Sequence, residues 1–406
     1  MLFVVGRRLK WTMIQSRCYL LRRGLIAAGF GIGFSSSINN LPTSQTARTT
    51  SARPIIAIVA PAESPILKAM PSALRERCQL IHVGETEAAM DAQADELCKA
   101  VALLWLPAGG KPSQAPSETL AALWPRLPRC KWVHSFATGV DGLRPFITGS
   151  LLPDKDRVVL TNGRGAFSES LAEHALAGML HFNKQLSRCE ENRRKGNWDC
   201  FTMDTMSGKT VGLVGYGSIG KNTGRSVKAA FGSRVIALRR QPQLGNGCGG
   251  GDDVADEVFG PEDRLAFLGK CDFVVCSLPG TDATLNFFGP EEFAAMKPGC
   301  VFLSLGRGAA VDEEALAAAL APAKVGDAAH LKGAVLDVFK VEPLPTSSPL
   351  WSLPNVLLTA HNADFTSDYF ELGWKVCGGN LEAFTSVHPE GSNKNLATPV
   401  DMQQGY

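Results

Sequence analysis

Short apolar runs alternate with stretches of helical spacing along the chain from about residue 53 onward. Three such runs come first, at residues 55–60, 100–106 and 132–136. Six more follow, at residues 210–214, 234–238, 272–278, 300–305, 333–338 and 355–359. Continuously apolar runs of this length are typical of strands that are buried on both faces, as in parallel sheets covered by helices. The pattern therefore predicts an α/β protein with doubly wound parallel sheets.

A long helix is predicted between the two groups of runs, over residues 168–186. Leu171, Ala175 and Met179 recur there at helical spacing. Glu169 lies near the predicted N-terminal end, where a carboxylate is favourable. We expect this helix to connect two domains.

The first 54 residues differ in composition from the rest of the chain. They carry eight Lys and Arg but no Asp or Glu, and they are rich in Ser and Thr. This composition predicts a mitochondrial or plastid targeting presequence, with the mitochondrion favoured, or a disordered leader outside the fold. The apolar run at 24–34 is far shorter than the ~20 residues of a membrane span, so no membrane partner is expected. A secretory or two-step plastid signal and a basic tail on a cytoplasmic protein are the alternatives.

Charge and cysteine content argue against two kinds of site. Without the eight cations of residues 1–54, 33 basic side chains stand against 39 acidic ones, which is a formal net charge of −6. A protein that binds the nucleic-acid backbone needs the opposite sign. The eleven cysteines are scattered and form no CxxC pair or zinc-type cluster. They are interpreted as reduced thiols, and no metal site is predicted.

A glycine-rich turn directly follows the apolar run at 210–214. Its residues are Gly215, Tyr216, Gly217, Ser218, Ile219 and Gly220, which give the GxGxxG spacing between a strand and a helix. The first glycine permits a tight turn, the second lets the backbone approach a pyrophosphate, and the third allows close packing of helix and strand. The phosphates would then lie at the N-terminus of the helix. This context predicts a Rossmann dinucleotide site, and a glycine-rich turn without a ligand is the alternative.

The end of the next predicted strand bears on the choice of dinucleotide. Arg239 and Arg240 stand where an enzyme that uses NAD usually has Asp or Glu. A carboxylate accepts hydrogen bonds from the ribose hydroxyls, whereas a guanidinium attracts the additional 2′-phosphate of NADP. NADPH is therefore expected to be preferred over NADH. The alternative is a solvated basic pair, and the glycine-rich insertion at 244–253 could alter the choice of cofactor.

Several further segments occur in an order that resembles one family. They are HSFATGVDGL at 134–143, LAEHALAGML at 171–180, GYGSIG at 215–220, SLPGTDAT at 277–284, MKPGCVFLSLGRGAAVDEEAL at 296–316, LDVFKVEPLP at 336–345 and LLTAHNA at 357–363. Together they resemble the D-isomer-specific 2-hydroxyacid dehydrogenases, which include glyoxylate/hydroxypyruvate reductases. The resemblance covers nearly all of residues 130–376.

The resemblance implies two Rossmann-like domains. A dinucleotide-binding domain is expected over residues 169–363. A substrate-binding domain is expected over residues 55–168 and 364–406, with a C-terminal helix at about 366–386 returning to it.

The resemblance also implies three catalytic residues, Arg307, Glu342 and His361. The planar guanidinium of Arg307 would hold a 2-oxo acid through its carboxylate and carbonyl oxygen. The unperturbed pKa of histidine lies near neutral pH, so His361 would donate a proton to the developing alkoxide as hydride arrives. Glu342 would orient the imidazole and stabilise its cation.

Further contacts with ligands are carried over from the same resemblance. The backbone amides of Thr138 and Gly139 would receive the substrate carboxylate. Asp337 would lie near the nicotinamide carboxamide, and Pro279 and Thr284 would line the adenosine side of the cofactor. The partner is thus expected to be a small 2-oxo or 2-hydroxy acid.

The resemblance leaves the side chain of the substrate open. The family commonly has Pro-His after the last strand, whereas Ala360 precedes His361 here, and Asn362 and Asp364 place polar groups next to it. We expect a reductase of the glyoxylate or hydroxypyruvate type that gives the D-hydroxy acid. We also expect a homodimer, with Trp198 near the contact between subunits.

Two other classes of protein remain open at this point. A dinucleotide-binding regulatory scaffold would keep the same fold without turnover, and the intact set of Arg307, Glu342 and His361 argues against it. A methyltransferase also uses a glycine-rich loop. It needs an acidic residue at the end of the second strand, where Arg239 stands.

Overall fold

The structure is a computed structural model. It describes residues 53–61, 63–84, 86–107, 116–241, 254–322, 328–386 and 391–406. The predicted presequence lies almost entirely outside the described residues, and so does the glycine-rich insertion at 244–253. Among the described residues, no helix is long and apolar enough to span a membrane.

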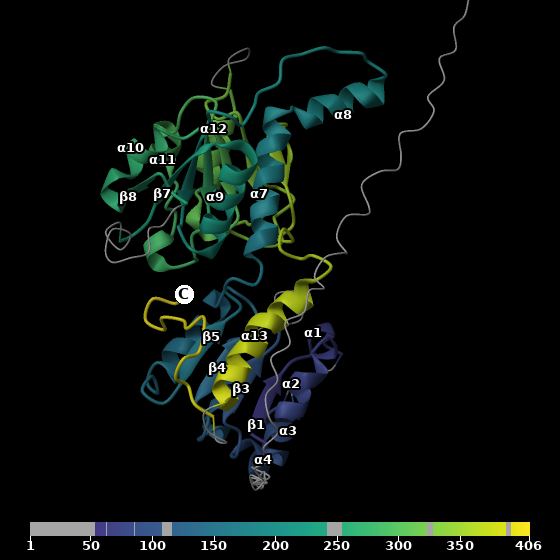
Figure 1. The fold of residues 1–406 in the computed structure, drawn as a ribbon, viewed down its shortest axis with the longest axis vertical. Coiled ribbons are helices and arrows are strands. Elements are labelled where there is room, and N and C mark those ends of the chain that lie inside the picture. Colours follow the sequence, from purple (N-terminus) through teal and green to yellow (C-terminus); the bar gives the residue numbers. More distant parts are fainter. Residues whose placement is uncertain are drawn as a thin grey trace, which may run out of the picture. The chain divides into compact units, whose positions relative to one another are not determined.

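Two parallel sheets form the framework of the described residues (Figure 1). The five-stranded sheet has the order β2-β1-β3-β4-β5, with β1 (Ile55–Val59), β2 (Gln79–His82), β3 (Ala102–Trp105), β4 (Trp132–Ser135) and β5 (Val159–Asn162). The seven-stranded sheet has the order β12-β11-β10-β9-β6-β7-β8, with β6 (Thr210–Val214), β7 (Arg234–Leu238), β8 (Glu257–Phe259), β9 (Phe273–Cys276), β10 (Val301–Ser304), β11 (Gly333–Leu336) and β12 (Val356–Leu358). The predicted fold, two Rossmann-like parallel sheets in an α/β protein, is confirmed.

Three of these strands have no counterpart among the predicted apolar runs. β2 and β8 are edge strands, and only one residue of each is buried. β5 is also an edge strand, and half of it is polar: Thr161 and Asn162 are buried, and their side chains are hydrogen-bonded. Edge strands need less apolar surface than central ones, so a search for apolar runs misses them.

The helices lie between the strands in the sequence. They are α1 (Pro65–Lys68), α2 (Ser72–Arg77), α3 (Glu87–Ala92), α4 (Ala94–Leu97), α5 (Pro116–Leu123), α6 (Arg144–Phe146), α7 (Ser168–Asn183), α8 (Leu186–Lys195), α9 (Ser218–Phe231), α10 (Arg264–Leu268), α11 (Pro290–Ala295), α12 (Glu313–Leu320) and α13 (Tyr369–Ser386). The predicted helix at 168–186 is α7, which ends three residues earlier than expected. Gln185 has φ 50°, a left-handed conformation that separates α7 from α8.

The helix α7 packs on the seven-stranded sheet. Its buried side chains Leu171, Ala175 and Met179 share one core with Val211 of β6 and Val335 of β11. We therefore name residues 168–363 the seven-stranded lobe.

The helix α13 returns to the five-stranded sheet, as predicted (Figure 1). Trp374 and Phe384 are buried in one core with Ile56 of β1 and Trp132 of β4. The Trp374 indole also donates a hydrogen bond to the carbonyl oxygen of Ile66 at 2.7 Å. We name residues 53–167 together with 366–406 the five-stranded lobe.

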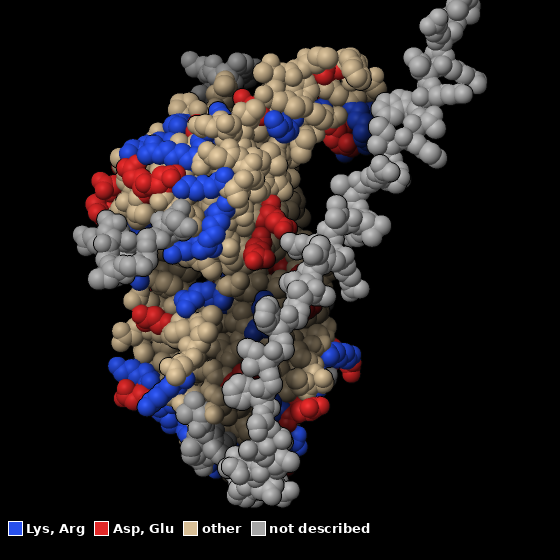
Figure 2. Space-filling model, in the orientation of Figure 1, with Lys and Arg blue, Asp and Glu red and all other residues tan. Residues whose placement is uncertain are grey.

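Charged side chains of both signs are interspersed on the face of the molecule drawn in Figure 2. Among the described residues, surface ion pairs include Lys228–Asp256, Arg234–Glu257 and Arg264–Glu291. Such exposed pairs contribute on the order of 0–1 kcal/mol each. The stability of the fold therefore rests on the buried apolar cores rather than on these ion pairs.

Candidate active site

The glycine-rich turn joins β6 to α9, a helix of 14 residues. Gly215 has φ 93°, which favours glycine, and its carbonyl oxygen accepts a hydrogen bond from Ser277 Oγ at 2.9 Å. A Cβ on Gly220 would lie 2.4 Å from that same carbonyl oxygen, so the close approach of helix and turn requires glycine there. A Cβ on Gly217 would meet nothing within 4 Å. The turn thus has open space in front of the N-terminus of α9, which fits the pyrophosphate of a dinucleotide.

The other residues of the turn differ in what they offer a ligand. Tyr216 is only 7% exposed, and its hydroxyl accepts a hydrogen bond from the backbone N–H of Ala255 at 2.9 Å. The Tyr216 ring belongs to the apolar core that α7 shares with β6 and β11, and Ile219 packs against that core. Their side chains therefore belong to the fold, and Ser218 is left beside the open space.

The residues expected around the adenosine lie at the ends of β7 and β9. Arg239 is half-buried and Arg240 is exposed at the end of β7. Thr284 Oγ1 donates to the carbonyl oxygen of Pro279 at 2.6 Å and accepts from the backbone N–H of Thr281 at 3.0 Å. The Thr284 hydroxyl therefore holds this loop closed.

Arg307 follows β10 and reaches the loop that follows β4. Its Nε donates to Asp141 Oδ1 at 2.9 Å, and its Nη1 donates to the carbonyl oxygen of Gly306 at 3.0 Å. A Cβ on Gly139 would lie 1.4 Å from Nη2 of Arg307. The absence of a side chain at Gly139 is therefore what lets the guanidinium occupy this position.

The loop after β4 also has backbone donors. Within the described residues, no hydrogen-bond acceptor is recorded for the backbone N–H groups of Thr138 and Gly139. The Thr138 hydroxyl donates to the carbonyl oxygen of Gly163 at 3.2 Å, and Asn162 Nδ2 donates to the carbonyl oxygen of Thr138 at 2.7 Å. These two bonds hold the loop and leave its N–H groups available to an anion next to Arg307.

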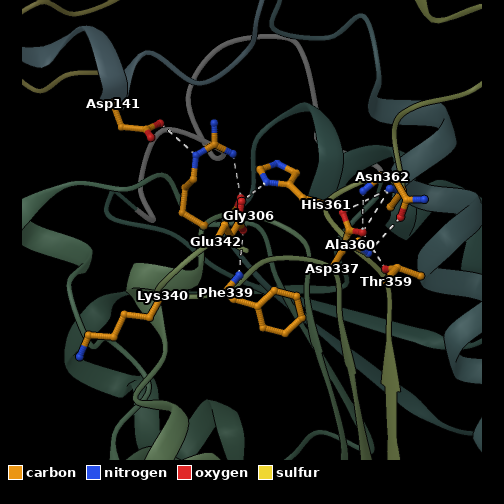
Figure 3. Close-up of polar contacts among 12 residues, drawn as sticks. Asp141, Gly306, Asp337, Phe339, Lys340, Glu342, Thr359, Ala360, His361 and Asn362 are labelled. Carbon is orange, nitrogen blue, oxygen red and sulfur yellow. Dashed lines mark hydrogen bonds and ion pairs between the residues drawn. The ribbon is translucent and has the colours of Figure 1, made fainter. Parts of the chain in front are cut away.

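Glu342 and His361 form a hydrogen-bonded pair (Figure 3). His361 Nδ1 and Glu342 Oε2 are 2.7 Å apart, and the other carboxylate oxygen accepts from the backbone N–H of Phe339 at 2.9 Å. The hydrogen bond to Glu342 raises the pKa of His361, although burial opposes this. Burial disfavours the Glu342 anion, but the hydrogen bonds from His361 and Phe339 outweigh it, so the pKa of Glu342 is lowered. The pair thus favours an imidazolium next to a carboxylate.

The turn that carries His361 is held by Asp337, which is only 2% exposed. His361 has φ 50°, which is uncommon for any residue other than glycine. Its backbone N–H donates to the carbonyl oxygen of Asp337 at 2.8 Å. The Asp337 carboxylate accepts from the Thr359 hydroxyl at 2.6 Å and from the backbone N–H of Asn362 at 3.1 Å (Figure 3). These hydrogen bonds to Asp337 therefore fix the backbone on both sides of His361.

The polar residues that distinguish this turn from the common family pattern have different roles. Asn362 Oδ1 accepts from the backbone N–H of Ala360 at 3.1 Å, so it closes the turn. Burial raises the pKa of Asp364, and the nearby charge of His361 lowers it in part. A second carboxyl group thus lies near the imidazole.

The structure brings Arg307, Glu342 and His361 into one site at the carboxyl ends of β10, β11 and β12, with Asp141 beside Arg307. Arg239 and Arg240 lie elsewhere, at the end of β7. Sequence reasoning assigned no role to Asp141. The signal that could have found it is its place in the small-residue turn that the family resemblance already puts at the substrate.

These features define an α/β protein with a dinucleotide-type turn and an arginine beside a carboxylate–histidine pair. A family model described as "D-isomer specific 2-hydroxyacid dehydrogenase, NAD binding domain" matches residues 176–363. The glyoxylate/hydroxypyruvate reductase B of Escherichia fergusonii is 31% identical over 257 residues, which are 61% of this chain and 72% of that protein. The chain belongs to the D-isomer-specific 2-hydroxyacid dehydrogenase family and is an NAD(P)-dependent enzyme of that family.

Solved structures agree with this assignment. A family member from Xanthobacter autotrophicus Py2, in complex with NADPH and MES, matches with a TM-score of 0.66 at 25% identity, over 86% of this chain and 99% of that one. An NADPH-dependent glyoxylate/hydroxypyruvate reductase from Sinorhizobium meliloti, in complex with NADP and malonate, matches with a TM-score of 0.61 at 25% identity, over 87% of this chain and 98% of that one.

Proposed function

We propose that this enzyme reduces a small 2-oxo acid of the glyoxylate or hydroxypyruvate type to the D-2-hydroxy acid, with NADPH as the preferred cofactor. The observation that carries the proposal is the 2.7 Å hydrogen bond between His361 and Glu342 in one site with Arg307. The similarity to glyoxylate/hydroxypyruvate reductases supports the substrate class.

Each residue of the proposed mechanism has a defined task. NADPH, when bound, supplies the hydride. Arg307 binds the carboxylate and the carbonyl oxygen of the 2-oxo acid, and the backbone N–H groups of Thr138 and Gly139 also receive the carboxylate. His361 donates a proton from Nε2 to the alkoxide oxygen, because Nδ1 is engaged by Glu342. Glu342 keeps the ring oriented and favours its protonated form.

The preference for NADPH rests on the two arginines at the end of β7. Neither Arg239 nor Arg240 is an acid that would accept from the ribose hydroxyls, and a guanidinium can donate two hydrogen bonds to a 2′-phosphate. Two relatives of known structure were solved with NADPH or NADP.

A homodimer is part of the proposal. Trp198 is 93% exposed, and it follows α8, a helix with no buried residue. An exposed tryptophan next to a helix that has no buried residue is typical of a contact between proteins.

Import into an organelle, with the mitochondrion favoured, is proposed from the composition of residues 1–54. A fusion of these residues to a fluorescent reporter is expected to reach the organelle. A reporter that stays in the cytoplasm would contradict this part of the proposal.

The function is tested by a matrix of substrates and cofactors. Glyoxylate, hydroxypyruvate, pyruvate and phenylpyruvate are each supplied with NADPH or NADH, and oxidation of the cofactor is followed. We expect the highest kcat/KM for glyoxylate or hydroxypyruvate with NADPH. A higher kcat/KM for phenylpyruvate would overturn the substrate class. Tight dinucleotide binding without turnover of any 2-oxo acid would instead indicate a regulatory scaffold.

A further inference from the structure

A short segment of the five-stranded lobe, Asp401–Tyr406, contacts one of the two arginines at the end of β7. Arg240 Nη1 donates a hydrogen bond to Gln404 Oε1. The Tyr406 hydroxyl donates to the same oxygen at 3.1 Å, and the guanidinium carbon of Arg240 lies 5.4 Å from the centroid of the Tyr406 ring. The Arg240 guanidinium is thus held by two groups, the amide oxygen of Gln404 and the aromatic ring of Tyr406.

The segment has an ordered structure of its own. Asp401 Oδ1 accepts from the backbone N–H groups of Gln403 and Gln404, at 3.0 and 3.1 Å. The backbone N–H of Gly405 donates to the carbonyl oxygen of Asp401 at 2.7 Å, and that of Asp401 donates to the carbonyl oxygen of Tyr406 at 3.0 Å. These bonds close the segment into a compact turn with Gln404 at a fixed place.

The turn is anchored in the five-stranded lobe. Val400, which precedes it, is buried in a core of that lobe, and its backbone N–H donates to the carbonyl oxygen of Leu160 at 2.9 Å. Met402 packs against the same core. The segment therefore reaches Arg240 from a rigid base.

A second contact connects the turn with the loop expected to line the adenosine. Arg144 Nη1 donates to the carbonyl oxygen of Gln404 at 3.5 Å, and its Nη2 lies 3.6 Å from Asp282 Oδ2. Asp282 belongs to the loop that contains Pro279 and Thr284. The segment is thus linked to both parts of the chain that the proposed cofactor site uses around the adenosine.

We propose that the segment Asp401–Tyr406 positions Arg240 for the 2′-phosphate of NADPH and thereby helps to determine the choice of cofactor. The inference rests on the proposed NADPH-dependent function. A long side chain that is already ordered loses less conformational entropy when a ligand binds. Both partners of Arg240 in the segment are neutral, so they orient the guanidinium without cancelling its charge. A carboxylate in place of Gln404 would compete directly with the phosphate.

The test is calorimetric titration of the enzyme with NADP⁺ and NAD⁺. Gln404→Ala is expected to weaken NADP⁺ binding by about fivefold and to leave NAD⁺ binding within about twofold, because NAD⁺ lacks the phosphate. Gln404→Glu is expected to weaken NADP⁺ binding by at least about tenfold. The matched control is Gln403→Ala, an exposed neighbour in the same turn, which is expected to change neither affinity.

A double-mutant cycle separates positioning from general loosening of the site. In an Arg240→Ala background, Gln404→Ala is expected to have no further effect on NADP⁺ binding. Thermal unfolding without cofactor shows whether each variant is folded.

Two results would overturn the inference, and they are distinguishable from each other. If the wild type binds NADP⁺ clearly more tightly than NAD⁺ but Gln404→Ala shifts both affinities equally or neither, the segment does not position Arg240. If the wild type binds both dinucleotides equally well, the proposed NADPH preference fails, and with it any role of the segment in that choice.

Discussion

At the residue scale, the position of Arg307, the proposed substrate-binding arginine, depends on a glycine in the other lobe. Arg307 belongs to the seven-stranded lobe, and its guanidinium lies against Gly139 of the five-stranded lobe. Asp141 from the same loop accepts a hydrogen bond from Nε. The loop after β4 thus supplies both the space and a fixed partner for the guanidinium, which leaves Nη2 available to a substrate.

Replacing Gly139 tests this arrangement. Gly139→Ala is expected to raise the KM for the 2-oxo acid by at least about tenfold, or about 1.4 kcal/mol, because the new Cβ would lie 1.4 Å from Nη2 of Arg307. The matched control is Gly142→Ala in the same loop, where a Cβ would meet nothing within 4 Å. Steady-state kinetics of both variants with saturating cofactor provides the measurement. Equal KM values for the two variants would mean that Arg307 does not bind substrate from this position.

The residues proposed to act on ligands were easier to predict than the residues that hold them in place. Arg307, Glu342 and His361 lie in sequence motifs that resemble those of the family, so the sequence alone is enough to predict them as site residues. The hydrogen bonds from the turn at 359–363 to Asp337 depend on the pairing of β11 with β12. This pairing cannot be predicted from the local sequence of either strand. Asp141 was missed for the same reason, because its partner Arg307 is 166 positions away in the sequence.

At the element scale, the strand–turn–helix unit of β6 and α9 uses its glycines for two different purposes. Gly220 makes room for the carbonyl oxygen of Gly215 inside the protein, whereas Gly217 faces open space. The first is needed by the fold, and the second is needed by the proposed ligand.

Two alanine substitutions distinguish these purposes. Gly220→Ala is expected to destabilise the protein by about 1–3 kcal/mol, because a Cβ there forces the helix away from the turn. Gly217→Ala is expected to leave the melting temperature of the cofactor-free protein nearly unchanged and to weaken NADP⁺ binding by at least about tenfold. Thermal unfolding and calorimetric titration of both variants test this. A loss of stability in Gly217→Ala with unchanged NADP⁺ affinity would reverse the assignment.

Elements of the fold were predictable in proportion to their apolar content. The central strands β1, β3, β4, β6, β7, β9, β10 and β11 consist mainly of apolar residues and were predicted within a few residues. The edge strands β2 and β8 are short and have only one buried residue each, so their pairing partners define them rather than their own sequences. The end of α7 was placed three residues too late because the left-handed conformation of Gln185 has no clear sequence signal.

At the scale of the whole molecule, the exposed Trp198 belongs to a surface that a second copy of the chain is proposed to cover. Light scattering is expected to give twice the mass of the chain. Trp198→Ser is expected to raise the dissociation constant of the dimer by at least about 30-fold, the effect of a buried interface tryptophan worth about 2 kcal/mol. The matched control is Trp351→Ser, at a tryptophan that is 56% exposed elsewhere in the seven-stranded lobe. A monomeric wild type, or equal effects of the two substitutions, would contradict a dimer at this surface.

The proposed chemistry needs both lobes. The proposed proton donor, His361, belongs to the seven-stranded lobe, and the N–H groups proposed to bind the carboxylate belong to the five-stranded lobe. The pH dependence of the reaction follows from the charge of His361. Ketone reduction needs the imidazolium, so kcat/KM is expected to fall as pH rises through the raised pKa of His361. Oxidation of the hydroxy acid needs the neutral ring, so its acidic limb reports the same pKa.

The pairing of Glu342 with a proton-donating His361 is tested most directly by the pH dependence of kcat/KM for reduction in the wild type and in Glu342→Gln. A deuterated cofactor establishes that hydride transfer limits the rate. Glutamine keeps the shape of Glu342 but removes the anion that raises the pKa of His361. The alkaline limb of reduction is therefore expected to move to lower pH in Glu342→Gln, and the acidic limb of oxidation is expected to move to lower pH with it. An alkaline limb that stays in place or moves to higher pH would contradict the pairing of Glu342 with a proton-donating His361.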